Sequence, residues 1–320
     1  MPDGLWLDAV VRLRAAREPA VLVTLATVRG HAPRRAGAKM VVSATGAWGS
    51  IGGGNVEAVA IERARAQLAD PAAVPELITC ELSERAPSEH GAQCCGGKVT
   101  VLLEPLRTVP AVAIFGTGHV GLELARILAR HDIELHLIDT RLDMLSESRL
   151  AVLAGAVATV HVHRVPLLPE SVFGELPSGT HVLIMTHDHA EDVALCDAAL
   201  RRDDLGSIGL IGSSGKWARF RRRLADEGGH DAQTIARIRT PIGLPDISGK
   251  EPATIAVSVA ADLLHTFERE AAPGRRGEPE TEPERETEPE PETEPEPETD
   301  PERETGPAVD LEPEGNGIRS

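Results

Sequence analysis

The middle of the sequence carries a glycine pattern that is typical of nucleotide-binding sites. Gly116, Gly118 and Gly121 form G-x-G-x-x-G directly after a continuously apolar run. The first glycine would permit a tight turn, the second would let the backbone approach a pyrophosphate, and the third would let a helix pack closely on the strand. Asp139, eighteen residues beyond Gly121, is expected at the end of the next strand, where a carboxylate can accept both ribose hydroxyls. The pattern predicts a nucleotide-type site that favours adenosine without a 2′-phosphate. Because Arg141 lies nearby, a cofactor with a 2′-phosphate is also possible. The competing explanation is that the glycines are retained for packing alone.

A histidine-rich triplet, His187-Asp188-His189, follows another apolar strand. Ligands of open α/β sheets bind at this carboxyl edge. The triplet could hold a metal, contact a ligand through its polar side chains, or cap the following helix through Asp188. The sequence leaves all three roles open. His161 and His163 share one face of a different strand, a pattern more typical of a solvated edge than of a site.

Two glycine-rich turns are expected to bind anions through their backbones. Gly52-Gly53-Gly54 leads into a helix that carries Glu57, and a helix start exposes N–H groups backed by the positive end of the helix dipole. Gly212-Ser213-Ser214-Gly215-Lys216 looks like a phosphate loop, but only two residues separate its glycines, so it lacks the G-x-x-x-x-G-K-[ST] spacing. Its amides could still contact an anion, with Lys216 and Arg219 either assisting them or solvating the helix.

The four cysteines, Cys80, Cys94, Cys95 and Cys196, fit a reducing compartment. Adjacent side chains diverge, so Cys94 and Cys95 are poorly placed to share one tetrahedral zinc ion, and the other two do not stand at CxxC spacing. A single exposed thiolate beside the flexible Gly96-Gly97 could act as a nucleophile or as a soft ligand for a metal such as molybdenum. A small buried cysteine is the alternative.

The elements that must position these residues follow two patterns. The first hundred residues read as helices and short strands, which indicates a smaller α/β domain that ends near Arg107 to Pro110. Its expected helices are 5–17 and 56–68, and its expected strands are 20–28, 39–43, 48–51, 76–82 and 98–104.

From Ala111 onward, strands alternate with helices, as in a doubly wound parallel sheet. The expected strands are 111–115, 134–138, 157–162, 181–185 and 207–211, and the expected helices are one ending at 130 and those at 191–201, 215–227 and 252–268. The predicted fold class is therefore α/β, with a smaller α/β domain (1–107), a Rossmann-like doubly wound parallel sheet (108–270) and a disordered acidic tail (271–320).

The tail consists almost entirely of Glu, Pro and Thr with scattered Arg. Between Pro273 and Ser320, seventeen acidic and five basic side chains account for −12 of the formal net charge of −17. Such a segment buries too little apolar surface to offset the entropy of ordering its backbone. We expect a solubilising appendage, with a docking site for a basic partner as the alternative.

Composition also excludes some classes of function. The rest of the chain is only mildly negative and contains no Tyr, so neither a concentrated basic face nor a base-stacking surface is expected, and nucleic-acid binding is not predicted. The sequence has no run of 18 apolar residues and no secretory signal pattern, which predicts a cytoplasmic protein without a membrane span.

Several segments, taken in their order and spacing, resemble the XdhC/CoxI family of molybdenum-enzyme accessory proteins. The resemblance covers nearly all of the chain before the tail. In the first half it rests on Gly30–Met40 with its Ala-Pro-Arg core, Gly49-Ser50-Ile51-Gly52-Gly53-Gly54 followed by Glu57, and Gln93-Cys94-Cys95-Gly96-Gly97. In the second half it rests on the glycine pattern from Gly116, Thr186–His189, Leu210–Ser213, and Pro241–Leu244 running on to Lys250, Pro252, Ile255 and Ala256. The departures are His31, where the family more often has a small residue, and the long acidic tail.

The resemblance implies an accessory protein rather than an enzyme. Such a protein binds the molybdenum cofactor, protects it during sulfuration, and inserts it into xanthine dehydrogenase or a related molybdenum hydroxylase subunit. A cysteine desulfurase is a further implied partner, and a homodimer is a further implied assembly. The turn at Gly52 would then receive the pterin phosphate, and Cys94 or Cys95 would face the metal. The expected cofactor-binding residues are Gly52, Gly53, Gly54, Glu57, Gln93, Cys94, Cys95, Gly116, Gly118, Gly121, Asp139, His187, Asp188, His189, Gly212 and Ser213.

Two other functions compete with this interpretation. An NAD(P)-dependent oxidoreductase would use the Rossmann domain in the usual way, but without Tyr the chain has no Tyr-x-x-x-Lys pair, and only the cluster from His187 to His189 could serve its chemistry. A nucleotide-sensing regulator would bind a dinucleotide, but it would neither catalyse a reaction nor deliver a cofactor.

Overall fold

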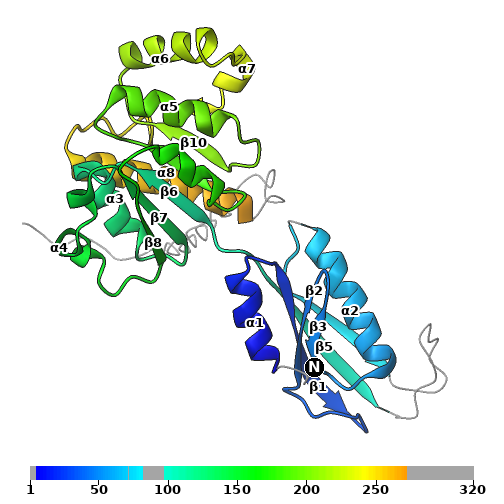
Figure 1. Ribbon diagram of the computed structural model, residues 1–320. Coiled ribbons are helices and arrows are strands. Elements are labelled where there is room, and N and C mark those ends of the chain that lie inside the picture. The colour runs from blue at the N-terminus through cyan, green and yellow to red at the C-terminus, as the bar shows by residue number, and fades with distance from the viewer. Residues whose placement is uncertain (1–4, 71, 82–96, 272–320) are drawn as a thin grey trace, which may run out of the picture. The chain divides into compact units, whose positions relative to one another are not determined.

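The computed structural model describes residues 5–70, 72–81 and 97–271, whose strands form two separate sheets (Figure 1). Gln93, Cys94 and Cys95 lie outside the described residues, as do residues 272–320 of the expected tail.

The first sheet has five strands in the order β3-β2-β1-β5-β4, and every neighbouring pair is antiparallel. Two helices accompany it. The elements are α1 (Trp6–Ala15), β1 (Ala20–Arg29), β2 (Lys39–Ser43), β3 (Ala47–Gly49), α2 (Gly54–Ala69), β4 (Glu76–Glu81) and β5 (Lys98–Leu106).

Alternation along β1 divides the core of this sheet between its two faces. Val21 and Val23 pack in one cluster with Ala60 of α2. Ala20, on the opposite face, packs in a second cluster with Leu13 of α1. The two helices therefore cover opposite faces of the sheet, and the turn that leads into α2 is held on one of them.

The second sheet has six strands, all paired in parallel, in the order β11-β10-β9-β6-β7-β8. Counted within this sheet, the order is 3-2-1-4-5-6 from the β8 edge, which is the Rossmann arrangement. The predicted doubly wound parallel sheet is confirmed. The strands are β6 (Ala111–Phe115), β7 (Glu134–Asp139), β8 (Thr159–Arg164), β9 (His181–Ile184), β10 (Ser207–Leu210) and β11 (Ile238–Arg239).

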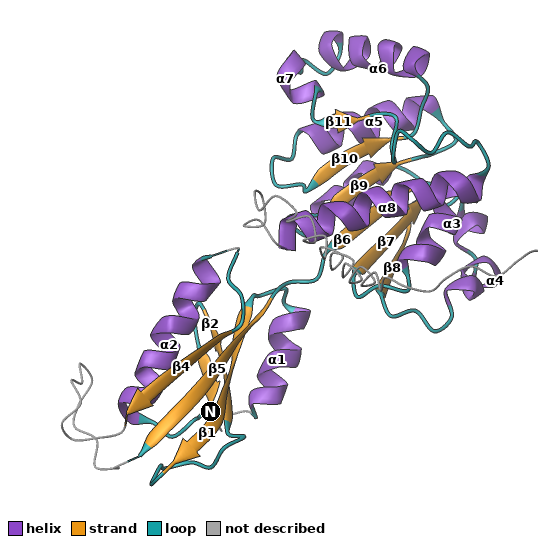
Figure 2. Ribbon diagram, turned by 180° about the vertical axis from the view of Figure 1, so that it is seen from behind, coloured by secondary structure: helices purple, strands orange, loops and turns teal. Residues whose placement is uncertain are grey.

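Helices cover both faces of the parallel sheet, as Figure 2 shows for α8 on one of them. Leu124 of α3 and Val259 of α8 belong to the core on one face, and Leu195 of α5 and Phe220 of α6 belong to the core on the other. Burying one such side chain contributes about 1.5–3 kcal/mol. The helices are α3 (His119–Leu128), α4 (Glu147–Leu150), α5 (His189–Leu200), α6 (Ser214–Asp226), α7 (Ala232–Ile235) and α8 (Pro252–Ala271), with 3-10 turns η1 (Leu142–Leu145), η2 (Ala151–Leu153) and η3 (Pro169–Gly174).

None of the helices in the described part of the chain has the length and apolar character needed to cross a bilayer.

Two strands differ from their expected bounds for identifiable reasons. β5 was expected to end before Pro105, yet it continues to Leu106. The pairing with β4 ends opposite Leu103, so Pro105 lies where β5 is an edge on that side, and a proline without an N–H is tolerated there. β8 begins two residues later than expected, because the amides of Val157 and Ala158 both donate to the carbonyl of Ala129 and hold these residues in a loop.

Candidate functional site

The carboxyl edge of the parallel sheet gathers the candidate residues of the second half. The glycine loop follows β6, Asp139 ends β7, the His187 triplet follows β9, and Gly212 and Ser213 follow β10. Strands β6 and β9 are neighbours, and the strand order reverses between them. Open α/β sheets bind their ligands at such a switch point, so the fold places these four loops around the expected crevice.

The three loop glycines differ in what surrounds them. At Gly116, where φ is +103°, an added Cβ would lie 2.4 Å from the carbonyl oxygen of Met185. At Gly121 it would lie 2.1 Å from the carbonyl oxygen of Gly116. Packing of the protein itself therefore explains these two glycines. At Gly118, the residue that caps α3, an added Cβ would meet only Nη2 of Arg141 at 4.0 Å. The protein's own packing does not require a glycine there, and the space lies beside a guanidinium.

Asp139 is occupied by bonds from its own chain. Its Oδ2 accepts from the Thr117 amide at 2.7 Å and from Nη2 of Arg141 at 3.0 Å. Its Oδ1 accepts from the Arg141 amide at 2.9 Å and from Nε at 3.0 Å. The carboxylate is almost fully buried and fastens the glycine loop to the end of β7. Ribose binding by Asp139 stays a prediction, and it requires the hydroxyls to share or displace the Arg141 contacts.

The bonds to Asp139 also set its acidity. Burial raises the pKa of its carboxyl group, but the hydrogen bonds from Arg141 and Thr117 outweigh burial and hold the pKa below its ordinary value of 3.8. The charged form is therefore the one that the folded protein stabilises.

This lowered pKa predicts a defined loss of stability in acid. A folded-state pKa below the unfolded value contributes stability above pH 3.8, and the contribution is lost as the pH falls through the folded-state value. Urea unfolding of Asp139→Asn between pH 5 and pH 2.5 should therefore show a shallower decline than the natural chain. The exposed Asp143→Asn is the control. Equal slopes for the natural chain and Asp139→Asn would contradict this role of Asp139.

The His187 triplet begins α5, and its central residue caps the helix. Oδ1 of Asp188 accepts from the amides of Ala190 at 2.6 Å and Glu191 at 3.2 Å. Those backbone bonds hold the pKa of Asp188 below its ordinary value. Of the three roles that the sequence left open, Asp188 fills the capping one. His187 and His189 are exposed at the crevice edge, and contact with a ligand by these two side chains stays a prediction.

A buried ion pair joins the loop after β9 to the loop after β10. Nζ of Lys216 donates to Oδ2 of Asp192 at 2.6 Å and to the carbonyl of Ile211 at 3.0 Å. Oδ1 of Asp192 accepts from the amide and hydroxyl of Thr186 at 3.1 and 2.8 Å. Lys216 thus points inward, and it neither solvates α6 nor presents a solvated charge to a phosphate. Ser213 caps α6 by accepting from the Lys216 amide at 3.3 Å.

Asp192 was missed from the sequence because it lies among apolar residues of α5. A carboxylate on the buried face of a helix needs a partner. Its position beside Val193, Leu195 and Cys196, all buried, was the available signal. Its partner Lys216 lies 24 residues further along the chain, which no local pattern connects to it.

The amides of the glycine turn in the first half already bind a carboxylate of the protein, that of Glu57. Oε2 of Glu57 accepts from the hydroxyl of Ser50 at 2.7 Å, the amide of Ile51 at 3.1 Å and the amide of Gly53 at 2.9 Å. Gly53 has φ of +73°, a conformation that glycine adopts most readily. A phosphate at this turn would therefore compete with the Glu57 carboxylate. Glu57 stands four residues after the N-cap Gly53, one more than in a capping box, so that motif does not reveal the contact in the sequence.

Neither described cysteine is part of these loops. Cys80 is half-buried on β4, and Cys196 is buried on α5. Burial raises the pKa of both thiols, so neither is an activated thiolate. The predicted roles of Cys94 and Cys95 stay predictions.

Comparison with known proteins places both sheets in one family. Residues 13–77 match the model of the XdhC and CoxI family, and residues 112–263 match the model of the XdhC Rossmann domain.

Individual relatives are more distant. The molybdenum cofactor insertion chaperone PaoD of Escherichia coli is 27% identical, over 79% of this chain and 86% of PaoD. The uncharacterized protein YqeB of Escherichia coli is 26% identical, over 80% of this chain and 44% of YqeB, so the chain spans less than half of that relative. A crystal structure described as a xanthine dehydrogenase from Bacillus halodurans is 19% identical with a TM-score of 0.41, and the match covers 82% of this chain and 96% of that one.

The two family models match successive parts of the chain, and the second falls on the parallel sheet whose strand order is that of a Rossmann domain. The chain belongs to the XdhC and CoxI family.

Proposed function

We propose that this protein is an accessory protein that binds the molybdenum cofactor and inserts it into a molybdenum hydroxylase such as xanthine dehydrogenase. The observation that supports the molybdenum cofactor as the ligand is the similarity to the insertion chaperone PaoD, which extends over 86% of that protein. Membership of the same family supports it. Protection of the cofactor during sulfuration, with a cysteine desulfurase as partner, and a homodimeric assembly are finer parts of the same proposal.

The geometry around Gly118 fits a phosphorylated ligand. The first N–H groups of a helix have no partner within the helix and attract anions, and Gly118 is the residue that caps α3. An added side chain at Gly118 would enter open space beside Arg141. That guanidinium is partly exposed, with 31% of its side chain accessible. The amides would hold the phosphate, and Arg141, whose charge is paired with Asp139, would act as a neighbouring hydrogen-bond donor.

The loops around this position are fixed before any ligand arrives. Asp139 fastens the glycine loop through Thr117, and the pair of Asp192 and Lys216 fastens the two loops on the other side of the switch point. A preorganised site spends less binding free energy on ordering its own backbone. This arrangement suits a protein that must retain a labile cargo.

An NAD(P)-dependent oxidoreductase is the second candidate. The observation that favours it is the 3-2-1-4-5-6 strand order with a glycine loop at the switch point, which receives dinucleotides in many folds of this type. The same open space at Gly118 would receive a nicotinamide dinucleotide or a pterin linked to a nucleotide.

Identification of the bound ligand separates the two functions. The full chain should be purified without oxygen from a host that makes the molybdenum cofactor, then analysed for metals and by mass spectrometry. We expect molybdenum together with the pterin. A dinucleotide without molybdenum, with turnover of an aldehyde or hydroxy acid, would overturn the carrier function and favour the oxidoreductase.

Glu57 provides a separate prediction for the turn of the first half. Glu57→Ala removes one charged acceptor from two amides and a hydroxyl and should lower the free energy of unfolding by about 1–3 kcal/mol. Urea unfolding of the purified variant measures the loss. Glu62→Ala, at an exposed position of the same helix, is the control. Equal stability of the two variants would show that Glu57 does not hold the turn.

A further inference from the structure

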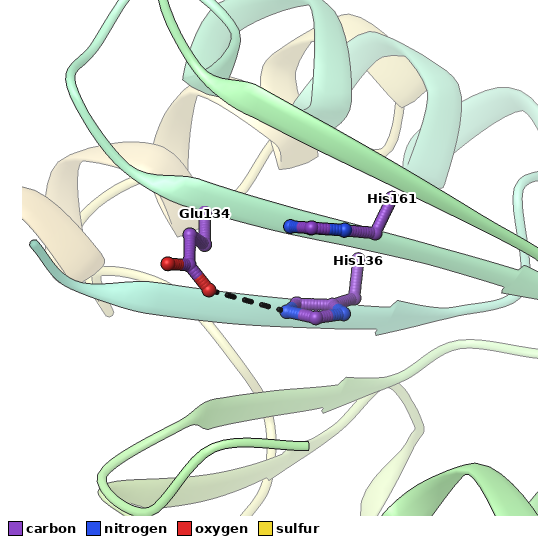
Figure 3. Close-up of side chains that lie close together, drawn as sticks. All are labelled: Glu134, His136 and His161. Carbon is purple, nitrogen blue, oxygen red and sulfur yellow. Dashed lines mark ion pairs between the residues drawn. The ribbon is translucent and has the colours of Figure 1, made fainter. Parts of the chain in front are cut away.

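Three histidines and a glutamate meet on strands β7 and β8, at the edge of the parallel sheet. In the parallel register His136 lies opposite His161, and their rings stack with centroids 4.5 Å apart. Glu134 precedes His136 by two residues and shares its face. Figure 3 shows the Glu134 carboxylate directed at the His136 ring, with the His161 ring beside it. The solvated edge expected for His161 and His163 is instead a half-buried cluster.

The contacts of His163 bear on the tautomer of His136. Nδ1 of His163 lies 3.5 Å from the Glu175 carboxylate, an ion-pair contact. Nε2 of His163 lies 3.1 Å from Nδ1 of His136, and which of these two nitrogens donates depends on the tautomers. When Nδ1 of His136 donates, Nε2 of neutral His136 carries a lone pair.

That lone pair faces another acceptor. Nε2 of His136 lies 3.9 Å from Oε2 of Glu134, and only 6% of the His136 side chain is exposed. Nε2 of His136 and Nε2 of His161 are both buried without a hydrogen-bond partner. Two buried acceptors that face each other repel unless a cation lies between them.

We propose that Glu134, His136 and His161 bind a divalent transition-metal ion, with Zn²⁺ as the best match. Two imidazole nitrogens and a carboxylate oxygen are a common zinc donor set, and an open fourth position would take water. The three donor atoms lie within 4.8 Å of one another. Tetrahedral zinc needs donors about 3.4 Å apart, so the two stacked rings must tilt toward each other and Glu134 must move by about half an ångström.

A third histidine and an arginine flank the three donors. His163 would support His136 from outside the coordination sphere, as a hydrogen-bond acceptor commonly does for a metal-bound histidine. Nη1 of Arg17 pairs with Oε1 of Glu134 at 3.1 Å, while the other oxygen, Oε2, faces His136. The site lies toward the amino end of β7 and is separate from the carboxyl edge where the cofactor is proposed to bind. The metal would hold the edge strand β8 against β7. Its binding would not depend on the molybdenum cofactor.

Metal titration of the chelator-treated full chain tests the proposal. We expect one Co²⁺ per chain with the intense visible absorption of tetrahedral coordination, displacement by one Zn²⁺, and a rise in Tm with Zn²⁺. His161→Gln, at a partly exposed position, should weaken Zn²⁺ binding at least 100-fold. His163→Gln should weaken it about 10- to 100-fold, because it removes only the outer support. His265→Gln, on the exposed face of α8, should leave the affinity unchanged.

Two results would overturn the metal site. One is absence of a saturable 1:1 complex. The other is equal affinity in His161→Gln and His265→Gln, which would place the bound ion elsewhere. If His161→Gln does not fold, Glu134→Gln answers the same question, because the amide keeps the shape of the side chain and removes the anionic donor.

Discussion

Replacing Lys216 by methionine is expected to lower the free energy of unfolding by about 3–5 kcal/mol. Asp192 has no exposed surface, and Lys216 is the cation that contacts it, at 2.6 Å. Removal of the ammonium group leaves a charged carboxylate in the core without a counter-ion. Urea unfolding of the purified variant measures the loss. The loops after β9 and β10 should also become more mobile, because the pair links them through Thr186 and Ile211.

A double variant separates the ion pair from the shape of the residues. Asp192→Asn combined with Lys216→Met removes both charges and keeps an amide oxygen that can accept from Thr186. Neutral replacement of a whole buried pair is often tolerated, so the double variant should be more stable than Lys216→Met alone. Arg219→Met, at an exposed position of the same helix, is the matched control. A loss for Lys216→Met within 1 kcal/mol of that control would contradict the buried pair.

Two alanine variants of the glycine loop should behave in opposite ways. In Gly121→Ala the new Cβ would lie 2.1 Å from the carbonyl oxygen of Gly116, so the backbone must shift and the free energy of unfolding should fall by about 1–3 kcal/mol. In Gly118→Ala the new Cβ would meet only the end of Arg141 at 4.0 Å, and the backbone there has φ of −65° and ψ of −156°. That variant should fold normally and yet lose at least tenfold in affinity for a phosphorylated ligand, because the methyl group fills the approach of the phosphate.

Thermal unfolding and ligand binding, measured on the same preparations, check the pair. Gly174→Ala is the control for the introduction of alanine at an exposed glycine with open space and without a positive φ. A Gly118→Ala protein with unchanged affinity would show that the ligand does not approach the backbone at this glycine. A Gly121→Ala protein as stable as Gly118→Ala would contradict the tight contact between α3 and β6.

Local sequence predicted the parallel sheet well because its strands are recognisable one at a time. Ala111–Phe115 is fully buried and reads as a continuous apolar run, which only a strand covered on both faces needs. The glycine loop, Asp139 and the His187 triplet follow such strands directly, so their gathering at one sheet edge could be predicted from the order of elements. The end of β5 could not, because tolerance of Pro105 depends on where β4 stops pairing.

The contacts between side chains were largely beyond local patterns. Asp192 and Lys216 are 24 residues apart, and His136 and His163 are 27 residues apart. The histidine cluster exists only because β7 and β8 pair in one register, since a shift by one residue would send His161 to the other face of the sheet. The sequence placed Glu57 at the correct turn. Only the structure shows that its carboxylate accepts hydrogen bonds from the amides of that same turn.

The most direct test of the central claim is anaerobic titration of the apo full chain with the molybdenum cofactor under reducing conditions, followed through the absorbance of the pterin. We expect saturable binding to the natural chain and binding at least tenfold weaker to Gly118→Ala, with both proteins equally folded. Absence of binding to the natural chain, or equal binding to both, would contradict a carrier that holds its cargo at the carboxyl edge of the parallel sheet.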